Sequence, residues 1–225
     1  MITGERMEKE KKNNVRQHRA MFQYVEEILY NYDRKKGENS KNKIAYDRYE
    51  HTVRVYKWMI RITNQLKDDT LDLESLKIAT IFHDAGYGEG GGENHAKVSS
   101  AICRDYLERR QYPPEQINFI CYLIEEHSNK KLFHEKNTRL ELVVLMEADM
   151  LDDTGAMGIV LDAWIASKEE RSSFDSVCRH IEKYTYRHMK QMEFVTAPGK
   201  KFWHEKRKLV YEFLRQYKKD LGDMK

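Results

Sequence analysis

The 225-residue sequence predicts an all-α protein, a compact helical bundle, on three observations. Glycine and proline are scarce, with 11 and 3 residues, which disfavours a turn-rich β-sandwich. Apolar residues recur every three or four positions along most of the chain. We find no convincing run in which apolar and polar residues alternate as they do in strands. Each expected helix needs neighbours to cover its apolar face, so we expect a single domain over 1–225.

The first three helices are predicted from apolar stripes at helical spacing. The second stripe includes His51, one turn before Val55, and Asp72 is suited to cap or open the third helix. The segment between the first two helices is polar and is expected to be a loop. The expected ranges are 12–31, 46–66 and 71–84.

A glycine-rich segment follows the third helix. Five of the 11 glycines fall in the seven positions Gly86–Gly92, directly after His83 and Asp84. Glycine lets the backbone approach a neighbour closely or adopt positive φ. We therefore expect a loop there that ends the third helix. It lacks the Gly-Lys-Ser/Thr ending of a phosphate-binding P-loop, so a lid is the better interpretation.

The remaining helices are bounded by proline and glycine. Pro114 is expected near the first position of its helix, and Gly155 and Gly158 mark a bend. Pro198 and Gly199 are expected to separate the last two helices. The expected ranges are 94–110, 113–127, 140–151, 159–166, 174–192 and 201–221.

Composition excludes several classes of protein. The formal charge of +3 is too small to indicate nucleic-acid binding. No run reaches the roughly 18 apolar residues of a membrane helix, and the charged N-terminus lacks the apolar region of a secretory signal. The cysteines Cys103, Cys121 and Cys178 are scattered and odd in number, which indicates buried thiols in a reducing compartment. We therefore expect a cytoplasmic protein.

Histidine and aspartate fall at selected helix positions. His51 lies inside a helix, His83 and Asp84 end one, and Asp149 follows the apolar run 142–146. His95 opens another helix and His127 ends one. With this composition, about half of one His-Asp dipeptide is expected in the chain by chance. A single such dipeptide is therefore uninformative, and only the joint pattern carries weight. Imidazole and carboxylate together suit divalent metals. An ionisable group beside apolar helices needs a partner, and a shared metal would serve both Asp84 and Asp149.

The ordered set resembles the HD superfamily of metal-dependent phosphohydrolases, and its end resembles a bacterial branch of uncharacterised hydrolases. The resemblance covers roughly 45–215, taken as the core of the domain, with the helix at 12–31 packing on or extending it. The matching segments are Arg48–Val55, Ala79–Gly86, Glu93–Ser100, Leu123–Ser128, Glu147–Ile159 and Phe194–Lys200 with Arg207.

The resemblance implies a buried metal site between helices. By position, His51, His83, Asp84 and Asp149 would bind one divalent cation, which could be Mn, Ni, Zn, Fe, Co or Mg. His95 and His127 occupy the place at which two-metal members add two histidines. They are expected either to reach a second ion or its phosphate, or to contact the substrate of a one-metal site.

The same resemblance implies hydrolysis of a phosphate ester or anhydride of a small substrate, most plausibly a nucleotide. Asp84 would hold the metal and orient or deprotonate the attacking water, while His127 or His95 would bind the phosphate or protonate the leaving oxygen. Glu93 is a further acid–base candidate. Cationic clamps for the phosphate are expected from Arg48, Arg54 and Lys97; surface charge is the alternative role of these three.

Two other functions remain open. A diiron oxygenase of the same fold would use the same six positions to hold two irons. A non-catalytic regulatory module would keep the metal for structure alone. The first 40 residues have no recognised counterpart and are expected to cap the core or to mediate a homodimer.

Overall fold

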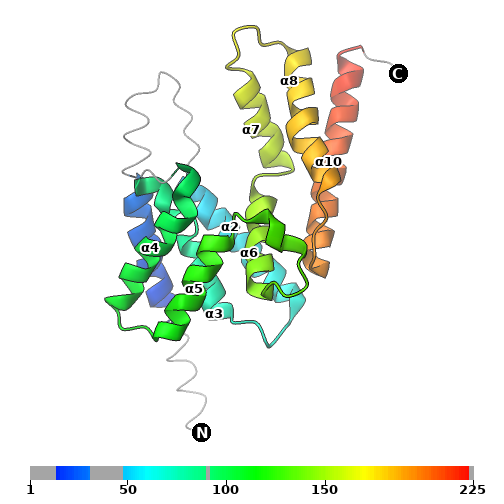
Figure 1. Cartoon of the computed structure of the whole chain (residues 1–225). Coiled ribbons are helices and arrows are strands. Elements are labelled where there is room, and N and C mark those ends of the chain that lie inside the picture. The colour runs from blue at the N-terminus through cyan, green and yellow to red at the C-terminus, as the bar shows by residue number, and fades with distance from the viewer. Residues whose placement is uncertain (1–13, 31–47, 90–91, 223–225) are drawn as a thin grey trace. The chain divides into compact units, whose positions relative to one another are not determined.

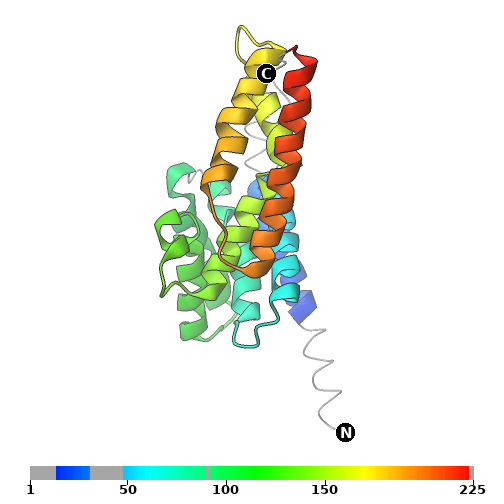
Figure 2. The ribbon, with the colours of Figure 1, turned by 90° about the vertical axis from the view of Figure 1, so that its right-hand side faces the viewer.

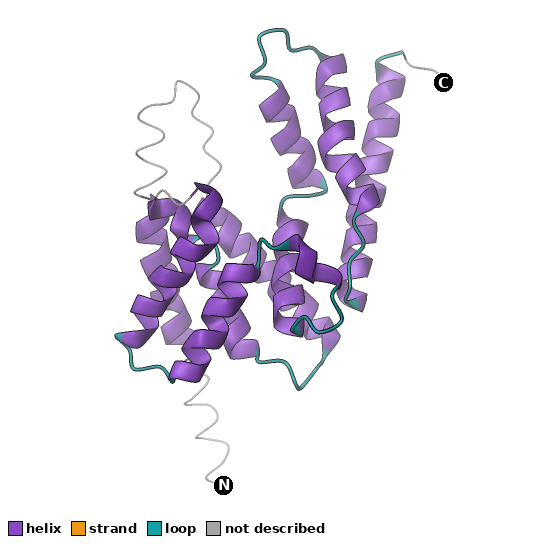
Figure 3. Ribbon diagram, in the orientation of Figure 1, coloured by secondary structure: helices purple, strands orange, loops and turns teal. Residues whose placement is uncertain are grey.

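A computed structural model describes residues 14–30, 48–89 and 92–222 of the chain. All regular structure in these ranges is helical and none is strand (Figure 3). This confirms the all-α fold. The first predicted helix is observed over 14–30, and residues 12, 13, 31, 46 and 47 of the predicted helices lie outside the described residues.

The remaining helices carry the labels of Figure 1. Three short segments, η1 to η3, are 3₁₀ turns, and η4 is a π-helical segment. In chain order the elements are α2 (Arg48–Leu66), α3 (Leu73–Phe82), η1 (Ala85–Glu89), η2 (Gly92–Asn94), α4 (His95–Glu108), α5 (Pro114–Glu126), η3 (Lys130–His134), α6 (Leu140–Asp152), α7 (Ala156–Ala166), α8 (Phe174–Ile181), η4 (Glu182–Tyr186), α9 (Arg187–Gln191) and α10 (Ala197–Asp220).

The chain divides into two compact units. The first comprises residues up to 57 and 70–145, and the second comprises 58–69 and the residues from 146 onward. Helices α2 and α6 therefore each contribute residues to both units. Our expectation of a single domain over the whole chain stays a prediction.

The core of the first unit is built around α3. Its side chains are buried nearly all round, and a helix that is apolar on every face belongs inside a protein. Helices α4 and α5 pack against it and against each other. Asp72 caps α3 as predicted, because its side chain accepts a hydrogen bond from the backbone N–H of Ser75 at 3.0 Å. The helix ends at Phe82, so His83 and Asp84 lie in the turn that follows.

The second unit contains three helices, α7, α8 and α10, that pack on one another. Figure 2 shows α8 and α10 side by side. Glu147 of α6 is buried and accepts hydrogen bonds from the backbone N–H groups of Val195 and Thr196 at 2.7 and 2.8 Å, and from the Thr196 hydroxyl. This carboxylate therefore fixes the chain just before α10.

Helix α7 begins at Ala156, so Gly158 lies inside it and not in the predicted bend. Two further differences from the prediction concern the last helices. Pro198 and Gly199 lie in the first turn of α10, which Thr196 caps through a hydrogen bond from the Gly199 N–H at 3.0 Å. The prediction that they separate two helices is wrong, because proline fits the first turn of a helix, where its missing N–H costs nothing. The helix predicted over 174–192 is interrupted by the π segment Glu182–Tyr186.

The glycine-rich segment is more ordered than the predicted loop. Its described residues form η1 and part of η2. Gly92 has the expected positive φ, at 49°, and Gly86 packs directly on α4. None of the described helices combines the length and apolar character that crossing a membrane requires.

Candidate metal centre

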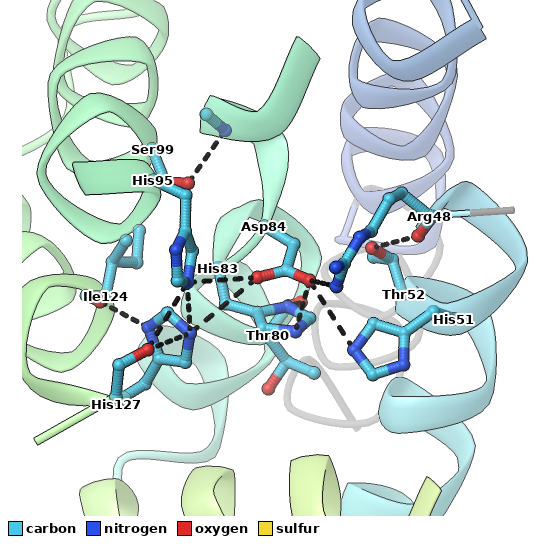
Figure 4. Close-up of polar contacts among 12 residues, drawn as sticks. Arg48, His51, Thr52, Thr80, His83, Asp84, His95, Ser99, Ile124 and His127 are labelled. Carbon is cyan, nitrogen blue, oxygen red and sulfur yellow. Dashed lines mark hydrogen bonds and ion pairs between the residues drawn. The ribbon is translucent and has the colours of Figure 1, made fainter. Parts of the chain in front are cut away.

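Four histidines surround one carboxylate in the first unit (Figure 4). Asp84 Oδ2 lies 3.5 Å from Nε2 of His51 and 3.8 Å from Nε2 of His83. Its other oxygen, Oδ1, lies 3.5 Å from Nε2 of His95 and 3.7 Å from Nε2 of His127. The carboxylate therefore presents one oxygen to each pair of imidazoles. These residues come from α2, from the turns that follow α3 and α5, and from the start of α4.

Three of the imidazoles are oriented by the same kind of hydrogen bond, between Nδ1 and a backbone carbonyl. Nδ1 of His83 lies 2.8 Å from the carbonyl of Thr80, and Nδ1 of His127 lies 2.6 Å from that of Ile124. Nδ1 of His95 lies 2.9 Å from the carbonyl of Gly92. A carbonyl can only accept, so each Nδ1 carries the hydrogen and each Nε2 is left as an electron-pair donor. In each case the partner is three residues earlier, because each histidine begins or ends a helical segment.

This donor set fits a divalent metal. Ligands that each lie about 2.1 Å from one ion are no more than about 4.2 Å apart, and all four Asp84–histidine distances satisfy that limit. Hydrogen bonding of the second ring nitrogen to a carbonyl is the usual support for a metal-bound histidine. Within the described part of the first unit there are two groups whose ligand atoms all lie within 4.8 Å of one another: His51 with His83 and Asp84, and Asp84 with His95 and His127.

Burial and charge have opposite effects on Asp84. Its side chain is almost fully buried, which disfavours the carboxylate, but the imidazoles of His83, His127 and His51 favour it more strongly. The pKa of Asp84 is therefore held well below its usual range. The pKa of His95 is lowered, chiefly because burial disfavours the charged ring, although Asp84 opposes that effect. An ionised carboxylate and a neutral imidazole are the forms that bind metals.

Arg48 is the predicted phosphate clamp that the structure brings to this cluster. Its Nη1 donates to Asp84 Oδ2 at 3.1 Å, and its side chain is 27% exposed. It opens α2 one turn before His51. A guanidinium that is half-buried beside the carboxylate, yet open to solvent, can also meet a bound anion.

The remaining predicted residues belong to α2, η2, α4 and α6. Arg54 pairs with Glu50 at 3.7 Å on α2. Glu93 is exposed in η2 and Lys97 is exposed on α4. Asp149 is half-buried on α6, in the second unit, and its place among the ligands stays a prediction.

Two side chains beside the cluster, Ser128 and Tyr87, were not among the predicted catalytic, metal-binding or substrate-binding residues. The Ser128 hydroxyl lies 3.1 Å from Nε2 of His127 and 3.3 Å from Nε2 of His95. The ring of Tyr87 stacks on that of His95, with centroids 4.3 Å apart. Ser128 follows His127 directly, so that adjacency was a usable signal, whereas Tyr87 stood in a segment interpreted as a loop.

Comparison with known protein families finds one match. Residues 48–154, the stretch that contains all six predicted ligand positions, match the model of the HD domain family. This segment of the chain is similar to the HD domain. No curated protein matches the sequence.

Solved structures extend the likeness beyond the HD domain itself. An HD-superfamily hydrolase from Bacillus thuringiensis superposes with a TM-score of 0.68 at 17% identity, covering 94% of this chain and 100% of that one. Bacillus subtilis YpgQ, solved in complex with ADP, gives 0.65 at 18% identity, covering 92% and 96%. The Lin1889 protein of Listeria innocua gives 0.58 at 20% identity, covering 89% and 99%. At this identity the likeness establishes the fold.

Proposed function

We propose that this chain is a metal-dependent phosphohydrolase that cleaves a phosphate ester or anhydride of a small substrate. The observation that carries the proposal is the position of Asp84 between two pairs of histidines, with Arg48 on the same carboxylate. The histidines and the carboxylate suit a cation, and the arginine suits an anion held beside it. A phosphoryl group bound next to a metal combines the two charges.

His51, His83 and Asp84 would hold a first divalent ion, with Asp149 as the predicted fourth ligand. Asp84, His95 and His127 would hold a second. A bound divalent metal supplies a water of lowered pKa and polarises a phosphoryl oxygen. The identity of the ion, among Mn, Ni, Zn, Fe, Co and Mg, and the number of ions belong to the proposal.

The chain's own groups then have distinct tasks. Asp84 would hold the metal and orient or deprotonate the attacking water. Arg48 would bind a non-bridging phosphate oxygen. Where no second ion is held, His127 or His95 in its protonated form, with a hydrogen on Nε2 as well as on Nδ1, would bind the phosphate or protonate the leaving oxygen. Glu93, which is exposed in η2, remains a proposed acid–base group.

A nucleotide is the proposed substrate. The support is the structure of YpgQ with ADP, a protein that shares the fold at 18% identity. Three buried thiols, Cys103, Cys121 and Cys178, support a reducing, cytoplasmic location. No specific nucleic-acid partner and no membrane are proposed. A homodimer stays a prediction.

The test combines metal analysis with phosphate release. Protein purified without chelator is analysed for bound metals and then assayed on nucleoside mono-, di- and triphosphates with Mn, Ni, Co, Zn or Mg. The variants are His83→Ala and Asp149→Ala. His134→Ala is the matched control, because this histidine is exposed in η3 of the same unit as His83.

We expect near-stoichiometric metal and phosphate release in wild type and in the control, with phosphate release lost and metal content reduced in the two variants. Two irons per chain with oxidase activity and no phosphate release would favour the diiron oxygenase instead. Bound metal without either activity would favour the regulatory module. Absence of metal, even after reconstitution, would exclude both enzyme functions.

A further inference from the structure

The ring of Tyr87 lies between two groups of the candidate site. The guanidinium carbon of Arg48 lies 3.9 Å from the ring centroid. The imidazole of His95 stacks on the same ring, with centroids 4.3 Å apart and planes 14° from parallel. Two groups that both lie about 4 Å from one centroid cannot occupy the same face. Arg48 and His95 therefore cover opposite faces of Tyr87.

The backbone of Tyr87 is fixed relative to Asp84 and α4. Its N–H donates to the carbonyl of Asp84 at 3.1 Å. The preceding residue, Gly86, packs so closely on α4 that a Cβ there would lie 2.3 Å from the carbonyl oxygen of His95. The Gly86 N–H also donates to the Ser99 hydroxyl at 2.8 Å. Tyr87 thus presents its ring from a short, anchored segment.

The two groups on the ring reach opposite oxygens of one carboxylate. Arg48 Nη1 lies 3.1 Å from Asp84 Oδ2, and His95 Nε2 lies 3.5 Å from Asp84 Oδ1. A free arginine side chain has many rotamers, and stacking on an aromatic face restricts them. The same ring restricts the tilt of the imidazole. One aromatic side chain therefore supports both ends of the Asp84 carboxylate.

We propose that Tyr87 is a positioning residue, whose ring holds the Arg48 guanidinium for the substrate phosphate and the His95 imidazole for the second ion. The inference rests on the proposed function and deepens it. Because both faces of the ring are covered, Tyr87 does not serve as a platform on which a nucleobase stacks. The contacts that carry this role come from the ring, so phenylalanine preserves them and leucine does not.

The first readout uses the metal alone. Chelator-treated wild type and variants are titrated with Co(II) and followed by visible absorption, which requires no substrate. The variants are Tyr87→Phe and Tyr87→Leu. Tyr122→Leu is the matched control, because Tyr122 is 37% exposed on α5 of the same unit. Tyr87→Met replaces Tyr87→Leu if circular dichroism shows that the latter fails to fold.

We expect wild type, Tyr87→Phe and Tyr122→Leu to bind two Co(II) ions alike. In Tyr87→Leu the second ion should bind about tenfold or more weakly, the range seen when a group that orients a ligand is removed. The second readout is the kinetics of phosphate release from ADP. KM should rise in Tyr87→Leu more than kcat falls, because Arg48 binds the phosphate in the ground state as well.

Wild-type affinities and wild-type KM in Tyr87→Leu would overturn the proposal. Equal damage in Tyr87→Phe would also overturn it, since the hydroxyl and not the ring would then be responsible. Binding of only one Co(II) ion by wild type would also overturn the proposal, since His95 would then have no second ion to bind. The Co(II) result stands without turnover: weakened second-ion binding with no phosphate release in wild type would support the role of Tyr87 and contradict the hydrolase.

Discussion

Nε2 of His95 lies 3.5 Å from Oδ1 of Asp84, whereas His51 and His83 face the other oxygen, Oδ2. This relationship turns one buried aspartate into the shared member of two ligand groups. The two groups should lose their ions separately when their histidines are removed, and the site should respond to small changes in how η1 and α4 pack.

Replacing His127 should remove one ion and spare the other. In His127→Ala the group of Asp84 and His95 loses a donor, while His51, His83 and Asp84 are intact. We expect the metal content after reconstitution with Co(II) to fall from two ions to one, as measured by elemental analysis. His83→Ala should instead reduce the binding of the first ion. Equal loss of both ions in His127→Ala would contradict two separable groups.

Arg48→Ala should weaken substrate binding. A hydrogen bond to a charged group contributes about 1.5–3 kcal/mol, so KM for the phosphorylated substrate should rise roughly ten- to hundredfold. Arg48→Lys should give an intermediate KM, because lysine keeps the charge but lacks the planar fork. Steady-state phosphate release measures both. Arg109→Ala, on an exposed arginine that pairs with Asp105, is the control and should keep the wild-type KM.

Gly86→Ala should destabilise the fold of the first unit. The added Cβ would meet two backbone atoms, the carbonyl oxygen of His95 at 2.3 Å and the nitrogen of Ser99 at 2.7 Å, neither of which can rotate away. We expect a loss of about 3 kcal/mol or more in the free energy of unfolding, measured by urea titration. Glu89→Ala, at the exposed end of η1, should change it by less than about 0.5 kcal/mol. A wild-type urea midpoint in Gly86→Ala would show that η1 can move aside.

Gly199→Ala should destabilise the second unit through Glu147. An added Cβ would lie 2.2 Å from Oε2 of Glu147, a carboxylate that three hydrogen bonds from Val195 and Thr196 hold in place. Moving the carboxylate would break some of these bonds, so we expect a loss of about 1–3 kcal/mol in unfolding free energy. The neighbouring exposed Lys201 provides the control Lys201→Ala, which should unfold at the wild-type urea concentration.

Lys206 should make stability rise with pH in alkaline solution. Burial lowers its pKa from the ordinary 10.5, although Asp152 opposes this shift, and its Nζ donates to the carbonyl of Thr154 at 3.0 Å. Between the lowered folded pKa and 10.5 the unfolded chain binds more protons at this site, so raising the pH favours the folded state.

The measurement for Lys206 is a difference between two proteins. Unfolding free energies of wild type and Lys206→Met are compared from pH 8 to 11, so that the tyrosines, which titrate in the same range, cancel. The wild-type value should rise relative to the variant as the pH increases. Parallel curves would mean that the pKa of Lys206 is the same in the folded and unfolded chain.

Local signals predicted the helices and the end of the third one, although His83 and Asp84, expected as its last two residues, lie in the turn that follows. The apolar run of α3 ends where glycines begin, and both features are visible in adjacent residues. The division of Asp84 between two histidine pairs depends on how α3, α4 and α5 pack, which involves residues far apart in sequence. Tyr87 was not predicted as a support for the same reason, because Arg48 and His95 reach its ring from different helices.

The misplaced boundary at Pro198 has a local cause. Proline and glycine together usually mark a turn, but proline is equally suited to the first turn of a helix. Glu147 decides between a turn and the start of a helix. Its carboxylate accepts hydrogen bonds from the backbone of Val195 and Thr196 and so fixes where α10 begins. That carboxylate is about 50 positions earlier in the chain, beyond the reach of a local pattern.

The π segment Glu182–Tyr186 constrains which changes of length the chain can accept. A π-helical turn contains one residue more than an α-helical turn, because its hydrogen bonds join residues five positions apart instead of four. Thr185 within it donates to the buried carboxylate of Asp162 from its backbone N–H at 3.1 Å and from its hydroxyl. Deleting the extra residue would restore a regular helix and change how Thr185 meets Asp162. This stretch should therefore tolerate substitution far better than the loss or gain of a single codon.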